Sequence, residues 1–219
     1  PFSWVSEQTP AKCVIFLKRT VVVTHAARMT RGFSRDLSRT AALGAFVKGR
    51  DMQKSTIGID LGGTNLKGII VDENGNRRHI TRIPTEADKG GPTILANIIK
   101  LIEILLKEEG DSSQVIGVGL GSPGFVDPNG TVLGGAENLS GWKGTQIFRP
   151  IHEKFGLKTT AGNDVTVAAL GEARFGAAKG VANMVCLALG TGVGGGIVIN
   201  NEIYQGSHGM AGELGHIVV

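Results

Sequence analysis

Asp60-Leu61-Gly62-Gly63-Thr64-Asn65 and Gly190-Thr191-Gly192-Val193-Gly194-Gly195 are two glycine-rich stretches from which the fold class can be predicted. Each follows an apolar, strand-like run, Thr56 to Ile59 in the first case and Met184 to Leu189 in the second. Glycine lets backbone N–H groups approach an anion closely and adopt backbone angles that side chains forbid. Two such loops from distant parts of one chain can hold the successive phosphates of a nucleotide, so the pair indicates a nucleotide-dependent enzyme.

The second glycine stretch also fits the dinucleotide-binding pattern G-x-G-x-x-G. That pattern needs a helix directly after the glycines, because the helix N-terminus holds the pyrophosphate. Here the run 196–199 indicates a strand, and Asn200-Asn201 and the run 202–204 complete a hairpin. We therefore reject a dinucleotide site. Neither loop contains the Gly-Lys-Ser/Thr of a Walker A motif.

Outward from the two loops, strands and helices alternate. Strands are expected over 57–61, 68–71, 78–84, 115–120, 157–160 and 184–189, and helices over 93–109, 145–155 and 164–178. An Asn-Gly turn joins the second strand to the third. Three strands in a meander followed by alternating helices and strands indicate an α/β domain with a mixed sheet. Because strand, glycine loop and strand then recur, we expect two copies of one design facing each other across a nucleotide cleft.

Charge divides the chain near residue 51. Residues 1–51 carry nine Lys/Arg and three Asp/Glu, whereas residues 52–219 carry fourteen and sixteen, although the whole chain has a net charge of +4. The part after residue 51 is therefore close to neutral, and no nucleic-acid partner is expected for it. Because Met52 precedes the first strand, we expect residues 1–51 to be a leader that is disordered or not native. A targeting peptide and part of a helix-turn-helix are the alternatives.

The cysteines and the apolar runs indicate the expected location of the protein in the cell. Cys13 and Cys186 offer no disulfide framework, which favours a cytoplasmic protein. The longest apolar run outside the expected fold, residues 14–27, is too short and too charged to cross a membrane. No membrane partner is therefore expected.

Asn163-Asp164 lies just after a strand and at the start of a helix. Asp164 has a structural interpretation, because aspartate is a favoured helix N-cap. The same place keeps a carboxylate charged and directs it at the crevice beyond the strand ends, where ligands bind in open α/β sheets. With two phosphate loops present, we favour the active-site interpretation, in which a carboxylate orients an attacking hydroxyl and accepts its proton.

The last segment, Gly209 to His216, places polar side chains between small residues. Glu213 and His216 are three residues apart, and a carboxylate such as Glu213 could accept hydrogen bonds from two sugar hydroxyls. Asn138 is a further candidate sugar contact. Trp142 can be either a core residue or a platform for the substrate.

Six of these motifs, taken in order and spacing from about residue 55 to 219, resemble the ROK family of sugar kinases and repressors. They are 60–65, 121–124, 138–142, 163–164, 189–196 and 212–216. The resemblance implies an actin-like (ribonuclease H-like) ATPase fold, with an N-terminal lobe over 52–180 and the start of a second lobe over 181–219. It also implies a homodimer.

By the same resemblance, the site divides among catalytic, nucleotide and sugar residues. Asp164 would be the catalytic base that activates a hexose hydroxyl, expected to be the 6-hydroxyl of glucose. Asp60 would help to position Mg²⁺. The sugar contacts would be Asn138, Asn163, Glu213 and His216, and the ATP contacts Gly62, Gly63, Thr64, Asn65, Gly190, Thr191, Gly192, Gly194 and Gly195.

The chain departs from the family pattern at one point, and two functions other than a kinase stay open. Family members usually carry cysteines soon after the Glu-x-Gly-His segment, which bind a structural Zn²⁺ together with that histidine, here His216. The chain ends at Val219 with no such cysteines, so we expect a fragment that is inactive by itself. A sugar-responsive transcriptional repressor and a non-catalytic sugar-binding module are the alternatives to the ATP-dependent kinase.

Overall fold

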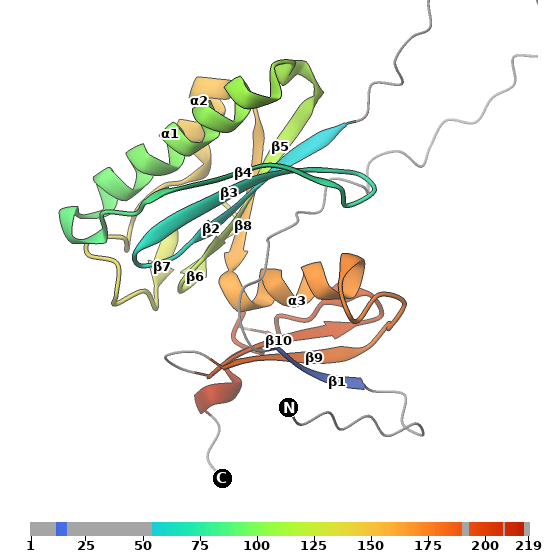
Figure 1. The fold of residues 1–219 in the computed structure, drawn as a ribbon. Coiled ribbons are helices and arrows are strands. Elements are labelled where there is room, and N and C mark those ends of the chain that lie inside the picture. The colour runs from blue at the N-terminus through green and yellow to red at the C-terminus, as the bar shows by residue number, and fades with distance from the viewer. Residues whose placement is uncertain (1–11, 17–53, 190–192, 208, 217–219) are drawn as a thin grey trace, which may run out of the picture.

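A five-stranded mixed sheet forms the centre of the first lobe (Figure 1). The computed structural model describes residues 12–16, 54–189, 193–207 and 209–216. The sheet has the order β4-β3-β2-β5-β8, with β2 Ser55–Leu61, β3 Asn65–Asp72, β4 Arg77–Pro84, β5 Val115–Ser122 and β8 Lys158–Asn163. β3 is antiparallel to both of its neighbours, whereas β2, β5 and β8 are parallel. The predicted α/β class with a mixed sheet is therefore confirmed.

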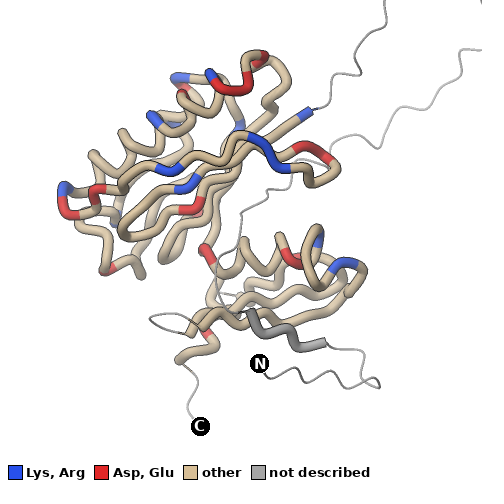
Figure 2. Tube along the Cα trace, viewed as in Figure 1, with Lys and Arg blue, Asp and Glu red and all other residues tan. Residues whose placement is uncertain are grey.

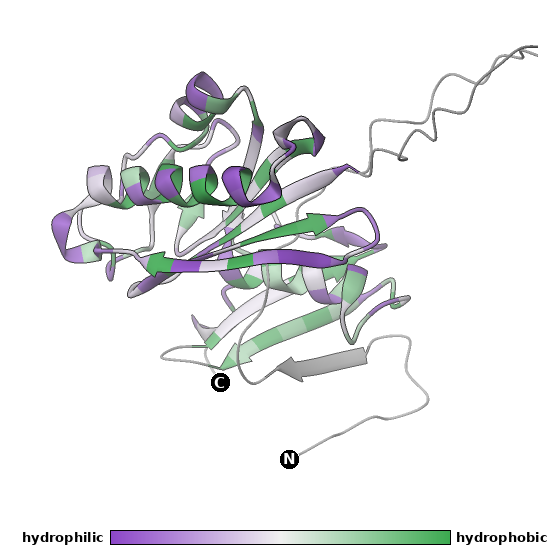
Figure 3. Cartoon of the chain, turned by 45° about the horizontal axis from the view of Figure 1, so that its top comes forward, coloured by the Kyte–Doolittle hydropathy of each residue, from purple (hydrophilic) through white to green (hydrophobic). Residues whose placement is uncertain are grey.

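Two helices cover one face of this sheet, α1 Gly91–Glu109 and α2 Phe148–Phe155. The buried residues of α1 follow a helical spacing, and they are Ile94, Ile98, Leu101, Ile102 and Leu105. Hydrophobic and hydrophilic residues alternate along α1 in Figure 3, as this spacing requires. The apolar stripe packs against the strands and forms one core with Ile57, Ile59 and Leu120. The breadth of this stripe is the reason that α1 could be predicted from the sequence.

The second sheet has the order β1-β9-β10-β11, with β1 Lys12–Phe16, β9 Met184–Leu189, β10 Val193–Ile199 and β11 Glu202–Ile203. β10 runs antiparallel to β9, as β3 runs antiparallel to β2. A strand therefore follows the second glycine stretch, as predicted, where a dinucleotide site would need a helix. The antiparallel pairing of β9 with β10 repeats the pairing of the strands that flank the first stretch.

β1 is the one part of residues 1–51 that the structure describes, and it pairs in parallel with β9. This pairing brings five residues of the expected leader to the second sheet. The remainder of that stretch lies outside the described residues, so the predicted boundary at residue 51 stays a prediction.

α3, Asp164–Phe175, lies between the two sheets (Figure 1). Its buried Ala169 and Ala173 join Met184, Cys186 and Val198 in a second apolar cluster. The second core therefore includes residues of α3, and the expected start of the second lobe at residue 181 stays a prediction. Cys186 is buried in this cluster.

A two-stranded ribbon, β6 Phe125–Val126 and β7 Val132–Gly134, stands beside the first sheet and was not predicted. Its strands are too short to give an alternating pattern of burial. Among the helices within the described ranges, none is long and apolar enough to span a membrane.

Candidate active site

The ends of three parallel strands bring the candidate catalytic residues to one edge of the first sheet. Asp60 in β2 pairs with Gly121 in β5, and Gly121 pairs with Gly162 in β8. Asn163 is the last residue of β8, and Asp164 is the first residue of α3. Ligands of open α/β sheets bind in the crevice beyond the carboxyl ends of the strands. The register therefore gathers the two aspartates where a ligand would bind.

Asn163, and not Asp164, is the N-cap of α3. The Oδ1 atom of Asn163 accepts hydrogen bonds from the backbone N–H groups of Val165, at 3.1 Å, and Thr166, at 3.2 Å. The capping interpretation of Asp164 is thus corrected. Asp164 Oδ1 accepts a 2.9 Å hydrogen bond from Val165 N–H, whereas Oδ2 has no hydrogen-bond partner among the described residues. One oxygen of this carboxylate is therefore available to a ligand.

Asp164 is half-buried, and its burial raises its pKa above the ordinary value for an aspartate. The nearby carboxylates of Asp60 and Glu213 raise this pKa further, while the hydrogen bond from Val165 N–H lowers it. The sequence predicted a carboxylate kept charged by the helix N-terminus. Desolvation and two like charges outweigh that effect here. A carboxylate with a raised pKa is a stronger proton acceptor, which suits a general base.

The first glycine stretch joins β2 to β3 and forms a tight turn. Gly62 N–H donates a 3.1 Å hydrogen bond to Asn65 O, and Gly63 and Thr64 are exposed at the tip. A Cβ atom on Gly63 would stand only 3.1 Å from Nδ2 of Asn138. The candidate phosphate loop and a candidate sugar contact therefore adjoin, although 75 residues of sequence separate them.

Lys67, which the sequence analysis did not single out, forms an ion pair with Asp60. The two residues face each other across β2 and β3, and Lys67 Nζ lies 2.7 Å from Asp60 Oδ2. Lys and Arg residues lie along β3 and β4 (Figure 2). The hairpin register was the available signal, because residues at equal distances from the turn face each other. The pair places a cation beside the glycine turn, where phosphate charge would need neutralising.

Asp60 is the candidate residue for a magnesium position. Its side chain is 25% exposed and stands one residue before Leu61 and the glycine turn. Mg²⁺ is commonly held by one or two protein carboxylates together with phosphate oxygens and water. A single carboxylate beside a phosphate loop fits this description. No group of three or more acidic, His or Cys side chains able to hold a metal occurs among the described residues.

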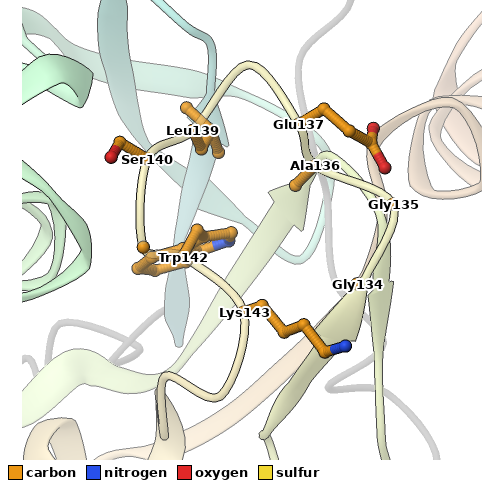
Figure 4. A pocket seen from close by; sticks show the side chains of 9 residues that line it. Gly134, Gly135, Ala136, Glu137, Leu139, Ser140, Trp142 and Lys143 are labelled. Carbon is orange, nitrogen blue, oxygen red and sulfur yellow. The ribbon is translucent and has the colours of Figure 1, made fainter.

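Asn138 stands in a loop whose inner side chains are firmly anchored. Trp142 is fully buried, and its indole Nε1 donates a 3.0 Å hydrogen bond to Oγ of buried Ser122. Trp142 is therefore a core residue and not a substrate platform. Asn138 itself is exposed. The loop encloses a hollow of about 270 Å³, with the charged side chains of Glu137 and Lys143 at its edge (Figure 4).

Glu213 is near enough for its charge to act on Asp164, because the segment 212–215 packs against β10 and the first turn of α3. A Cβ atom on Gly212 would stand 2.4 Å from the carbonyl oxygen of Gly195. His216 Nδ1 lies 3.4 Å from Glu213 Oε2, and the His216 side chain is 82% exposed. The backbone contact thus places Glu213 beside the catalytic candidate, while His216 faces solvent.

The described residues do not fit a structural Zn²⁺ site at His216. Such a site takes about four N or S ligands in a tetrahedral arrangement. Within the described ranges the one charged partner of His216 is the carboxylate of Glu213, and Cys186 is buried in β9 within the second core. No step is therefore assigned to zinc.

The second glycine stretch is described only in part, because Gly190, Thr191 and Gly192 lie outside the described residues. Gly194 and Gly195 are strand residues of β10. A Cβ on Gly194 would lie 2.6 Å from a methyl group of Val165, and one on Gly195 would lie 2.5 Å from Gly212 O. Both glycines thus allow β10 to pack closely, Gly194 against α3 and Gly195 against the segment at Gly212. This packing requirement is separate from any contact with a nucleotide.

Comparison with known proteins agrees with this geometry. A model of the ROK family matches residues 56–219. A glucokinase from Halalkalibacterium halodurans is 40% identical over 164 residues, which cover 74% of this chain and 49% of that protein. The xylose repressor of Bacillus subtilis is 30% identical over 171 residues, covering 75% of this chain and 42% of the repressor. The chain thus spans about half the length of the curated relatives it matches, or less.

Solved structures show the same fold. The crystal structure of a ROK family glucokinase from Streptomyces griseus, in complex with glucose and AMPPNP, matches with a TM-score of 0.66 and 36% identity. The match covers 75% of this chain and 51% of that one. The predicted actin-like class is therefore confirmed. Because the family model matches most of the chain and the solved relatives share its fold, the chain belongs to the ROK family.

Proposed function

We propose that the protein transfers a phosphoryl group from ATP to a hydroxyl of a hexose, with glucose as the expected substrate. The observation that carries the proposal is the carboxylate of Asp164. It lies at the strand ends beside Asp60 and Glu213, one of its oxygens is available, and burial raises its pKa. The similarity to glucokinases supports a sugar as the acceptor.

In this proposal Asp164 holds the reacting hydroxyl and accepts its proton. The hydroxyl oxygen forms a bond to the γ-phosphorus, the bond from that phosphorus to the ADP oxygen breaks, and the proton moves to Asp164 Oδ2. Mg²⁺, when bound, neutralises charge on the phosphate oxygens, and Asp60 would hold it.

The sugar and phosphate contacts are assigned to the residues around Asp164. Asn163 Oδ1 is engaged by α3, so its amide nitrogen is the group left to donate to a sugar hydroxyl. Asn138, which borders Gly63, and Glu213 are assigned to the sugar as well, and so is His216 through its contact with Glu213. The backbone of Gly62 to Asn65 and of the segment 190–195 would receive the phosphates.

The test is an assay of ATP consumption by the complete protein across a panel of hexoses. Asp164→Asn keeps the shape of the side chain but removes the proton acceptor, so we expect turnover to fall by a factor of about 10² or more. Glu153→Gln, an exposed carboxylate on α2, is the matched control and should leave turnover unchanged. Sugar-dependent turnover that survives Asp164→Asn would refute the role of this residue.

A sugar-responsive repressor is the second candidate, and the xylose repressor among the relatives favours it. A repressor needs to bind sugar but does not need to hydrolyse or transfer phosphate. Sugar binding without turnover of any hexose, measured on folded protein, would support this second function against the first.

A further inference from the structure

Thr85 is one of the few fully buried polar residues of the described chain, and none of the motifs above includes it. It follows the last residue of β4 and precedes a short 3-10 turn, Ala87–Lys89. Because a buried hydroxyl needs a hydrogen-bond partner, the partners of Thr85 show what its position accomplishes.

Thr85 binds both sides of the first glycine turn. Its Oγ1 donates a 2.6 Å hydrogen bond to the carbonyl oxygen of Gly62, and its backbone N–H donates a 3.0 Å hydrogen bond to the carbonyl oxygen of Thr64. One residue outside the turn thus holds two carbonyl groups of the turn, with Gly63 between them.

The geometry of the peptide bond makes these contacts relevant to phosphate binding. A peptide unit is planar and trans, so its C=O and the following N–H point in opposite directions. With the carbonyl of Gly62 fixed on Thr85, the N–H of Gly63 is directed away from Thr85. Backbone N–H groups directed outward from a glycine turn are the donors that bind phosphate oxygens.

The position of Thr85 is itself held by α1. Asn97 Nδ2 donates to the carbonyl oxygen of Thr85, at 3.2 Å, and to the carboxylate of Glu86, at 3.1 Å. Glu86 also pairs with Lys89 and adopts a left-handed backbone conformation with φ 55°. A non-glycine residue in this conformation is held there by its surroundings, and such residues cluster at functional sites.

The charges around the turn indicate on which side a phosphate would lie. A hollow beside the turn is bordered by Gly63, Thr64, Glu86 and Asp88. Two carboxylates at its edge disfavour an anion there. Asn138 also borders Gly63, and Lys67, paired with Asp60, supplies a cation in the strands next to the turn. A phosphate is therefore expected away from Glu86 and Asp88.

We propose that Thr85 is a positioning residue for the nucleotide phosphates, which acts by holding the carbonyl of Gly62 so that the Gly63 N–H group faces the phosphate. The inference rests on the proposed ATP-dependent function. Asn97 supports Thr85 from α1 in the same role.

The test compares Thr85→Val, which removes the hydroxyl, with Thr85→Ser, which keeps it, in the complete protein. The affinity for AMPPNP is measured by calorimetry, and KM for ATP and for the sugar are measured separately. Thr81→Val on the same strand is the matched control, because the Thr81 hydroxyl donates to exposed Glu108. We expect Thr85→Val to weaken AMPPNP binding and raise the KM for ATP by about tenfold, with the KM for the sugar unchanged. Thr85→Ser and Thr81→Val should stay near wild type.

Amide hydrogen exchange at Gly62, whose N–H is bonded to Asn65 O within the turn, gives a readout that does not depend on turnover, and Thr85→Val should accelerate it. If the wild-type protein binds AMPPNP and Thr85→Val binds it equally well, the role of Thr85 is refuted while the kinase proposal stands. An equal loss in Thr85→Ser and Thr85→Val would also refute it, because the hydroxyl would then not matter. If the folded wild type binds no nucleotide at all, the proposed function itself fails.

Discussion

The hydrogen bond between Trp142 and Ser122 offers a quantitative test of how the candidate sugar loop is held. Both side chains are fully buried, and Trp142 Nε1 donates to Ser122 Oγ at 3.0 Å. Ser122 Oγ in turn donates to the carbonyl oxygen of Pro123 at 2.9 Å. Ser122→Ala removes the acceptor of the indole N–H without adding volume, so the indole group would remain buried without a partner.

The expected cost follows from that loss. An unsatisfied buried donor costs about 1–3 kcal/mol of the free energy of unfolding. For a domain of this size each kcal/mol lowers the melting temperature by about 2–4 °C, so a decrease of about 2–12 °C is expected. Trp142→Phe removes the donor and leaves a cavity, which makes it the more destabilising of the two substitutions. The double variant should lose less free energy of unfolding than the sum of the two single losses, by about 1 kcal/mol, because both single variants remove the same hydrogen bond.

The assay is urea unfolding of the wild type, both single variants and the double variant, with Ser140→Ala as the control. Ser140 is an exposed serine of the same loop, so its substitution should change stability by less than about 0.5 kcal/mol. If Ser122→Ala is as stable as Ser140→Ala, or if the two single effects add fully in the double variant, the indole is not anchored through Ser122 and the argument is wrong.

Two further predictions concern the catalytic carboxylate and the packing of α3. Because burial holds the pKa of Asp164 above its ordinary value, the native state binds this proton more tightly than the unfolded chain, and ionised Asp164 destabilises the fold at neutral pH. Asp164→Asn should therefore raise the melting temperature at pH 7. This gain in melting temperature should vanish at a pH below the ordinary pKa of aspartate. An equal gain at pH 7 and at the low pH would contradict the reasoning. Gly196→Ala should lower the free energy of unfolding by about 1–3 kcal/mol, since the new Cβ would stand 2.5 Å from the Cβ of Ala169; urea unfolding at wild-type stability would show that α3 does not pack this closely on β10.

Most of the helices and strands, and most of the candidate residues, could be predicted from the spacing of residues along the chain. The apolar stripe of α1, the strand before each glycine stretch and the strand after the second one all follow from the spacing of apolar residues, because burial on one face imposes a period. Asp60, Asp164 and the glycine turn could be proposed for a similar reason. They stand at the ends of predicted strands, where α/β folds place their ligands.

Which of these residues act on one another became clear from the folded structure. In the folded chain Asn163 caps α3, and Trp142 is buried in the core. Burial and two neighbouring carboxylates raise the pKa of Asp164. The fold also brings Thr85 to the carbonyl of Gly62, 23 residues away. Burial, charge neighbours and hydrogen-bond partners depend on residues that are distant in sequence, and no local pattern of side chains encodes them.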